Sequence, residues 1–423
     1  MKKFNCWNVT LMLTALFFSH GIAAEPVEPN SVDETLLAVE DSPQTKAITQ
    51  AENWPGYLGP NRNGISSETG WNPGDPQVRW KFEVGIGFSS IAIVDGMLYT
   101  AGFKEGKDYL YCLAADSGDE KWQFSYPSEL MDKNHEGGPA STPEVKDGVV
   151  YIVSKLALLH ALDAENGKLL WSKDLHKEFE VNVPDFGYSG SVLVVNDWLI
   201  LDGGSTVLLN KKDGSLVWKS EDNGISYSSP ALIKNGENSS VAVFGVQGLA
   251  IINLANGQTV AKHPWTATYD VAAVTPLIDG NRVFISSGND VGCAMLELTS
   301  NNELKQLWKT EAMSNKMANS ILWQGYLYGF NYEELACVDA TTGESKWSQE
   351  GLGMGSLIMA DGKLIILSEQ GELIIAEANP ERFVDLHRKH ILGGRCMTTP
   401  AFSGKRIFAR NAEGNLVCLD AGS

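Results

Sequence analysis

The side chains in this sequence that are best suited to bind a ligand stand just outside short apolar runs. Tyrosines can stack on flat groups, carboxylate and amide oxygens can bind cations, and an arginine can bind an anion. The candidate binding residues are Tyr188, Tyr227, Asp270, Asn289, Asp290, Asn331, Tyr332 and Arg395. Together they suit an organic ligand or a peptide; the alternative interpretation is that they only line a water-filled channel.

Motifs for covalent, hydrolytic or nucleotide chemistry are absent from the sequence. It holds no G-x-S-x-G, H-E-x-x-H, P-loop or dinucleotide fingerprint, and no nucleophile stands near a base. Asp270, Asn289 and Asp290 have oxygens that calcium accepts, but acids are common in this chain. His387 and His390 we interpret as part of a solvated basic edge. We therefore predict no catalytic residue and no metal ligand.

A repeat of four short strands must position these side chains. In its clearest copy, residues 141–171, Asp-Gly and Asn-Gly dipeptides at 147–148 and 166–167 mark hairpin turns between alternating apolar and polar runs. The last copy stops after three strands at Ser423, and the segment QVRWKFEV around Trp80 has the form of the missing fourth strand. The sequence therefore predicts an all-β fold, an eight-bladed β-propeller of four-stranded antiparallel blades whose ring is closed by an N-terminal strand.

A tryptophan recurs on the outer strand of most copies, four residues after a turn glycine where that turn is present. A large apolar ring with one N–H can lie across the neighbouring blade and donate to a backbone carbonyl there. The repeat sets the spacing, which favours blade docking over an exposed aromatic platform for a ligand. The predicted docking residues are Trp80, Trp122, Trp171, Trp218, Trp308 and Trp347.

The strand order also predicts which loops share a face. The short Asp-Gly and Asn-Gly turns lie on one face, and the links between blades lie on the other together with the turns between second and third strands. The longest links, 125–141 and 176–190, and all the candidate binding residues belong to this second face, which we call the upper face.

The repeat ALDAENGKLLW, with its Asp-Gly turns and the opening WPGYLGPNRNG, resembles the quinoprotein-type propeller repeat over roughly residues 54–423. Proteins with this repeat include dehydrogenases that use pyrroloquinoline quinone and the outer-membrane assembly factor BamB. The resemblance implies either a non-enzymatic exported propeller that binds a protein or envelope component through its upper face, or a pyrroloquinoline quinone-dependent alcohol or sugar dehydrogenase with calcium. The sequence lacks the adjacent cysteine pair of many such dehydrogenases and the lipid-attachment cysteine of the assembly factor. We favour the first function, with no cofactor.

Four segments follow from composition. Residues 1–24 have the basic start, apolar run and small residues of a signal peptide, with cleavage expected after Ala23 or Ala24. Residues 25–52 form a flexible acidic leader, 53–77 an irregular collar and 78–423 the propeller. We expect a periplasmic or secreted monomer with no transmembrane helix in the mature chain.

Charge and cysteine content exclude further classes. Removal of Lys2 and Lys3 with the signal peptide changes the formal net charge from −19 to −21, which disfavours nucleic acid as a partner. The five remaining cysteines have no C-x-x-C spacing, so neither a disulfide framework nor a zinc or haem site is indicated.

Overall fold

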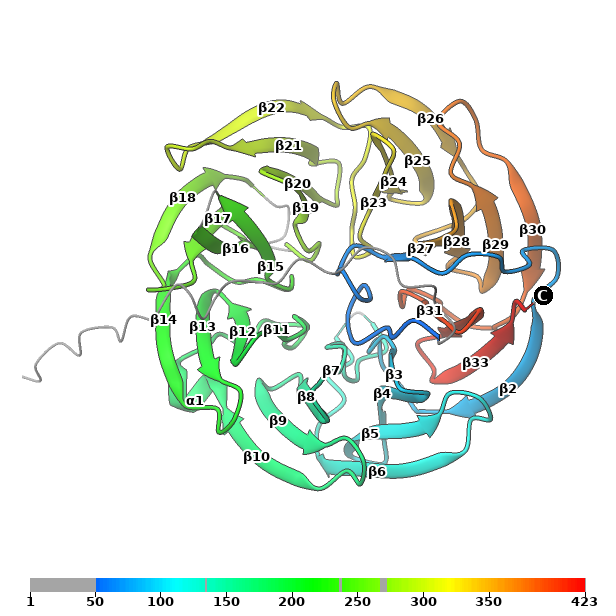
Figure 1. Ribbon diagram of the computed structural model, residues 1–423, viewed down its shortest axis with the longest axis horizontal. Helices are drawn as coiled ribbons and strands as arrows, with labels where there is room; N and C mark the ends of the chain where they lie inside the picture. Colours follow the sequence, from blue (N-terminus) through cyan, green and yellow to red (C-terminus); the bar gives the residue numbers. More distant parts are fainter. Residues whose placement is uncertain (1–50, 134, 236–237, 267–271, 423) are drawn as a thin grey trace, which may run out of the picture.

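The computed structural model describes residues 51–133, 135–235, 238–266 and 272–422, which form eight antiparallel sheets arranged in a ring (Figure 1). The predicted signal peptide and nearly all of the predicted leader lie outside these residues. Each sheet is a blade whose first strand faces the central axis and whose fourth strand lies on the circumference. The predicted eight-bladed β-propeller is confirmed.

The blades follow one another in chain order. Blade 1 holds β3 (Ala92–Val94), β4 (Met97–Lys104), β5 (Lys107–Ala114) and β6 (Glu120–Pro127); blade 2 holds β7 (Glu144–Lys146), β8 (Val149–Val153), β9 (Leu158–Asp163) and β10 (Leu169–Asp174), followed by helix α1 (Leu175–Phe179). Blade 3 holds β11 (Leu193–Val195), β12 (Trp198–Gly203), β13 (Ser205–Asn210) and β14 (Leu216–Asp222); blade 4 holds β15 (Ala231–Asn235), β16 (Asn238–Gly245), β17 (Gly248–Asn253) and β18 (Thr259–Pro264).

The second half of the ring repeats the pattern. Blade 5 holds β19 (Leu277–Asp279), β20 (Arg282–Ser287), β21 (Gly292–Leu298) and β22 (Leu304–Thr310); blade 6 holds β23 (Ile321–Trp323), β24 (Tyr326–Asn331), β25 (Glu334–Asp339) and β26 (Ser345–Gln349). Blade 7 holds β27 (Ser356–Ala360), β28 (Lys363–Leu367), β29 (Glu372–Glu377) and β30 (Asp385–His390), with β1 (Ile65–Ser66) parallel to β27; blade 8 holds β31 (Ala401–Ser403), β32 (Arg406–Arg410), β33 (Asn415–Asp420) and β2 (Gln77–Glu83).

Blade 8 combines the two ends of the described chain. Its outer strand β2 pairs antiparallel with β33, with Trp80 opposite Cys418. Arg410, at the end of β32, is fully buried, and its guanidinium donates to the carbonyl oxygens of Ala101 at 2.6 Å and Gly85 at 2.9 Å. Because these carbonyls belong to blade 1 and to the link that precedes it, Arg410 ties blade 8 to blade 1 and is not available to a ligand.

The hydrophobic core lies between the blades. Second and third strands are buried along most of their length because both of their faces contact a neighbouring sheet. The buried residues divide into clusters that each join the facing sides of adjacent blades, such as blades 1 and 2 or blades 5 and 6. Each blade therefore buries its apolar faces on its neighbours, as expected for a repeat protein.

The two ends of the Gly-x-x-x-Trp motif meet across the seams between blades. Trp122 of blade 1 lies against Gly167 of blade 2, where a Cβ would approach the ring to 2.5 Å, and its Nε1 donates to the Ala164 carbonyl at 3.0 Å. Gly257 lies against Trp218 in the same way. The glycine thus accepts the tryptophan of the preceding blade, and its missing side chain and positive φ both serve that contact.

Two seams lack the tryptophan. In blade 4 Ala261 takes its position, and the side-chain amide of Asn281 donates instead to the Leu298 carbonyl of blade 5 at 3.3 Å. In blade 7 His387 stands opposite Ile375, in the register that Trp347 has in blade 6. His387 is therefore a partly buried residue with Asp75 3.7 Å from its Nε2, which corrects its interpretation as a solvated edge.

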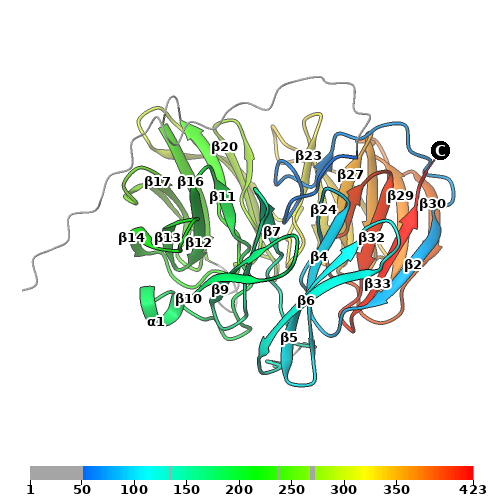
Figure 2. The ribbon, with the colours of Figure 1, turned by 60° about the horizontal axis from the view of Figure 1, so that its bottom comes forward.

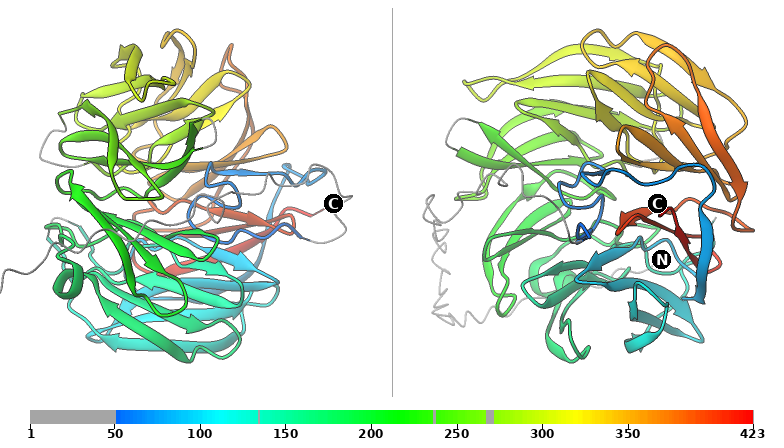
Figure 3. Two further views of the ribbon diagram at one scale, coloured as in Figure 1. Left: turned by 60° about the vertical axis from the view of Figure 1, so that its left-hand side comes forward. Right: turned by 45° about the vertical axis from the view of Figure 1, so that its right-hand side comes forward.

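The segment between Trp54 and Ser66 crosses the centre of the ring on the face of the Asp-Gly turns, the lower face (Figures 1 and 3). Trp54 pairs with Ile93 of blade 1, and β1 pairs with β27 of blade 7, on the other side of blade 8. Glu68 accepts hydrogen bonds from the backbone N–H groups of Gly404 and Lys405 in blade 8. These contacts to several blades hold the collar over the lower end of the channel.

No helix within the described residues is long and apolar enough to cross a membrane.

Candidate functional site

The upper face is formed by the links between blades and by the turns between second and third strands. Figure 2 shows the long β4–β5 hairpin at this face, on the side of the ring away from the collar. The collar covers the lower end of the channel, and on the upper face the loops of different blades come together.

Four successive links each contribute one aromatic ring to a continuous row on the upper face. Phe88 and His135 have ring centroids 5.7 Å apart, His135 and Phe186 5.5 Å, and Phe186 and Tyr227 6.0 Å. All four rings are half-buried. We call Phe88, His135, Phe186 and Tyr227 the aromatic row.

Charged groups flank the aromatic row. Arg395, from the link before β31, lies 3.4 Å from Glu136 of the β6–β7 link and 3.7 Å from Glu369 of blade 7. Lys133 pairs with Asp185 at 2.8 Å, and both side chains are exposed. The ion pairs connect loops of different blades, and because they are exposed each contributes at most about 1 kcal/mol.

His135 is neutral in this setting. Its Nδ1 accepts a hydrogen bond from the Gly137 N–H at 2.8 Å, so the proton of the neutral ring is on Nε2. Desolvation by burial lowers the pKa of His135; Glu136 opposes this effect and Arg395 adds to it. The ring therefore adds an uncharged aromatic surface with one N–H donor at neutral pH.

A second group of predicted residues gathers at blades 5 and 6. The Tyr332 hydroxyl donates to Asn289 Oδ1 at 2.5 Å, joining the second turns of the two blades, and Asn331 Oδ1 accepts from the Ser314 N–H at 2.9 Å. Lys316 lies over the Tyr332 ring, with Nζ 5.1 Å from its centroid. The structure thus brings Asn289, Asn331 and Tyr332 together, whereas Asp290 is exposed beside them.

The other predicted residues have different surroundings. Tyr188 is 1% exposed and packs with Val181 and Val192 in the core between blades 2 and 3. Burial raises the pKa of its hydroxyl, which has no hydrogen-bond partner among the described residues. Tyr188 supports the upper face from below and does not contact solvent. Asp270 lies outside the described residues.

A buried ion pair fixes the loops around the aromatic row. Lys155 Nζ lies 2.7 Å and 2.9 Å from the two carboxylate oxygens of Asp108, and both side chains are 1% exposed. Ser128 also donates to Asp108, and the Lys155 carbonyl accepts from the Tyr188 N–H. Because desolvated charges must be paired, this arrangement holds the second turns of blades 1 and 2 in one position.

A belt of hydroxyl groups surrounds the channel at the start of the innermost strands. Thr142 N–H donates to Ser191 Oγ at 3.0 Å, Ser191 N–H to Ser229 Oγ at 2.9 Å, and Ser229 N–H to Thr275 Oγ1 at 3.0 Å. Ser90 Oγ continues the belt to blade 8 by donating to the Thr399 carbonyl. The hydroxyls satisfy backbone groups of the neighbouring blade, so they serve the ring rather than a ligand.

An ion pair joins the collar to the wall of the channel at the start of the innermost strands. Arg62 of the collar lies 2.9 Å from Glu144 of β7 and also donates to the Val192 carbonyl of blade 3 at 3.0 Å. Desolvation raises the pKa of Glu144 to about 7 although Arg62 opposes the shift. This pair attaches the collar to blades 2 and 3.

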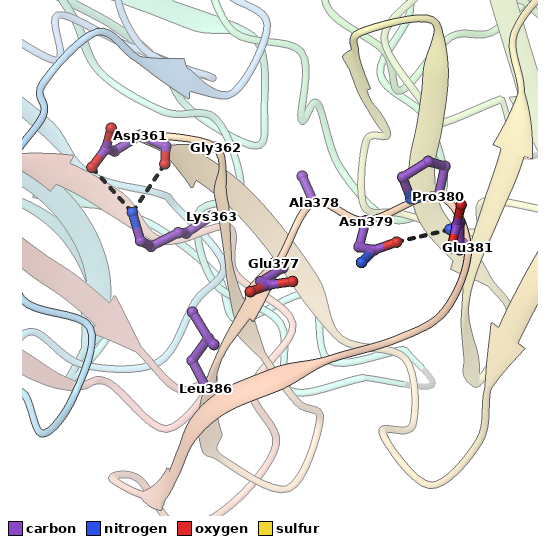
Figure 4. Close-up of a pocket in the computed structure, with 9 residues that line it drawn as sticks. All are labelled: Asp361, Gly362, Lys363, Glu377, Ala378, Asn379, Pro380, Glu381 and Leu386. Carbon is purple, nitrogen blue, oxygen red and sulfur yellow. Dashed lines mark hydrogen bonds and ion pairs between the residues drawn. The ribbon is translucent and has the colours of Figure 1, made fainter.

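A hollow of about 560 Å³ lies at the rim of blade 7, between the β27–β28 and β29–β30 turns (Figure 4). Its polar groups bond to one another: Lys363 Nζ lies 3.0 Å from Asp361 Oδ2, and Asn379 Oδ1 accepts from the Glu381 N–H. No group of three or more metal-ligating side chains occurs in the part of the chain that the structure describes. The upper face, where the links of four blades bring their aromatic rings together, is the candidate site.

The sequence identified the links, but of the aromatic row only Tyr227 was among the candidate binding residues. Phe88, His135 and Phe186 were not. His135 and Phe186 lie inside the long links 125–141 and 176–190, but each link holds other aromatic residues, so the sequence did not single them out.

Comparison with known proteins places residues 106–349 within a sequence family described as outer membrane protein assembly factor BamB. The chain is 23% identical over 299 residues to that factor from Moranella endobia. The aligned region covers 65% of this chain and 73% of the relative. The crystal structure of BamB from Moraxella catarrhalis superposes with a TM-score of 0.62 at 15% identity, over 82% of this chain and all of that one.

A quinoprotein ethanol dehydrogenase from Pseudomonas aeruginosa is also similar, with 29% identity over 143 residues. That match covers 30% of this chain and 22% of the dehydrogenase. The shared part is therefore a limited number of propeller repeats.

Proposed function

The chain belongs to the family described as outer membrane protein assembly factor BamB, and we propose that it is an exported, non-enzymatic propeller that binds another protein through its upper face. The observation that carries the proposal is the aromatic row: rings from four links form one surface, and the surrounding ion pairs hold those links in place. Interfaces between proteins are rich in half-buried aromatic and arginine side chains of this kind.

The periplasm is the compartment that this proposal assigns. The names of the relatives, outer membrane protein assembly factors, support a place at the envelope. The basic and apolar start of the chain has the composition of an export signal. The partner in this proposal is a protein or other component of the envelope.

Capture of partners from an envelope extract tests the proposal. The upper-face variant carries Phe186→Ala, Tyr227→Ala and Arg395→Ala, and we expect tagged protein with these changes to lose the partners that the wild type captures. The row supplies the contact surface, and most binding energy at an interface comes from a few such residues.

The matched control removes exposed leucines of the outer strands: Leu170→Ala, Leu216→Ala and Leu307→Ala, which are 49%, 42% and 41% exposed. This control should capture the wild-type partners, and thermal melting should show that both variants are folded. Unchanged partners with the upper-face variant, or their loss with the control alone, would refute the proposal.

A quinone-dependent dehydrogenase is the second candidate function, favoured by the match to the ethanol dehydrogenase. The described residues do not fit the cofactor: Asn289 Oδ1 is bonded to Tyr332, Asp290 is exposed, and no group of three acidic or other metal-ligating side chains is present among them. Titration with pyrroloquinoline quinone and calcium, followed by dye reduction with alcohols, decides between the functions. Binding with turnover would establish the dehydrogenase.

A further inference from the structure

We propose that the aromatic row binds an extended segment of the partner that carries arginine or lysine side chains. The inference rests on the proposed function, because it names the chemistry of the segment that the upper face would hold. Its evidence is the shape of the row, the chemistry of its rings and the charge around them.

The row is elongated. Its rings come from the links before β3, β7, β11 and β15, which follow one another around the ring, and each centroid is within 6.0 Å of the next. An extended chain places alternate side chains on one side, so several of them can contact successive rings. A compact ligand would contact only one or two.

The rings offer a surface for cations. Phe88, Phe186 and Tyr227 are uncharged aromatics, and the lowered pKa of His135 keeps that ring neutral as well. A guanidinium or ammonium group that lies over an aromatic face is attracted by its quadrupole. Contacts of this kind already occur elsewhere in this protein, for example at Lys309 over Trp265 and at Lys316 over Tyr332.

Carboxylates outnumber cations around the row. Asp132 and Glu136 act electrostatically on His135, Asp185 acts on Tyr227, and Glu369 lies beside Arg395. The two cations, Lys133 and Arg395, are already paired with carboxylates of this group. The excess negative charge has the sign of the whole chain, so it attracts a cationic segment and repels an anionic one.

Binding of short synthetic peptides to the full chain tests the charge requirement. One peptide alternates valine and arginine, a second replaces arginine by citrulline, which keeps the shape without the charge, and a third replaces it by glutamate. By fluorescence anisotropy, we expect the arginine peptide to bind at least about tenfold more tightly than the citrulline peptide, and less tightly at high salt. Equal affinities for the arginine and citrulline peptides would overturn the inference.

Two variants locate the binding. Phe186→Ala with Tyr227→Ala removes half of the row, and Asp132→Asn with Asp185→Asn removes two carboxylates. Each pair of changes should lower the affinity for the arginine peptide by about tenfold. The control with the same charge change, Glu165→Gln with Glu344→Gln, lies in exposed turns of the lower face and should bind as the wild type does. Equal weakening by the control would also overturn the inference, because the effect would then be one of net charge.

The envelope capture separates this inference from the proposed function. If the variant with Phe186→Ala and Tyr227→Ala loses its captured partners while the variant with Asp132→Asn and Asp185→Asn keeps them, the upper face binds a protein but not through cationic side chains. If the variant with Phe186→Ala and Tyr227→Ala keeps all partners, the proposed function itself fails.

Discussion

Replacement of Gly167 by alanine should loosen the seam between blades 1 and 2. A Cβ at this position would stand 2.5 Å from Trp122 Cε3, well inside contact distance, so the indole must move. Trp122 is 9% exposed and donates to the Ala164 carbonyl at 3.0 Å. Displacement of the ring therefore costs packing and one hydrogen bond.

The expected magnitude follows from two separable costs. Alanine at a positive φ costs about 1–2 kcal/mol, and the steric conflict with the indole adds about 1–3 kcal/mol. Gly148 in the same blade provides the control, because its φ of 75° matches the 71° of Gly167 but a Cβ there would meet nothing within 4 Å. Gly148→Ala should show only the first cost.

Thermal unfolding followed by circular dichroism measures the difference, at about 1 °C per kcal/mol for a chain of this length. We expect Gly167→Ala to melt about 1–3 °C below Gly148→Ala. In the background of Trp122→Ala the extra cost should vanish, because the ring is no longer there to clash. Equal melting temperatures for the two alanine variants, or full additivity with Trp122→Ala, would refute the contact as the reason for the motif.

Three further predictions concern buried charge and the ends of the chain. Lys155→Met should cost about 3–5 kcal/mol in urea unfolding because Asp108 stays buried without its cation, and adding Asp108→Leu should recover part of the loss; no recovery would contradict this. The pKa of Glu144, about 7 in the folded state and 4.5 as the ordinary value, means that the folded protein holds more protons between these pH values, so stability falls by roughly 3 kcal/mol as the pH rises through that window. In Glu144→Gln the free energy of unfolding, measured across this pH window, should no longer fall. If it still falls in that variant, groups other than Glu144 cause the pH dependence. Deletion of residues 78–85, which include most of β2, should cost most of the stability, and a melting temperature like that of the parent would show that the ring does not depend on this strand.

The sequence by itself determined the repeat and therefore the fold. Asp-Gly and Asn-Gly turns such as Asp147–Gly148 specify hairpins through positive φ angles, and alternating apolar residues specify strands with one or two buried faces. These are local signals, since each depends on residues a few positions apart. These local signals were enough to predict eight blades and to divide their loops between two faces.

The tertiary structure alone decided which residues meet across blades. Gly167 belongs with Trp122 of the preceding blade and not with Trp171 of its own motif, and the aromatic row joins rings from four separate links. It also placed Tyr188 in the core although its link is on the upper face. Such contacts depend on how far each blade is rotated from the next and on how each link packs, and no short sequence pattern records either, because the partners belong to different repeats.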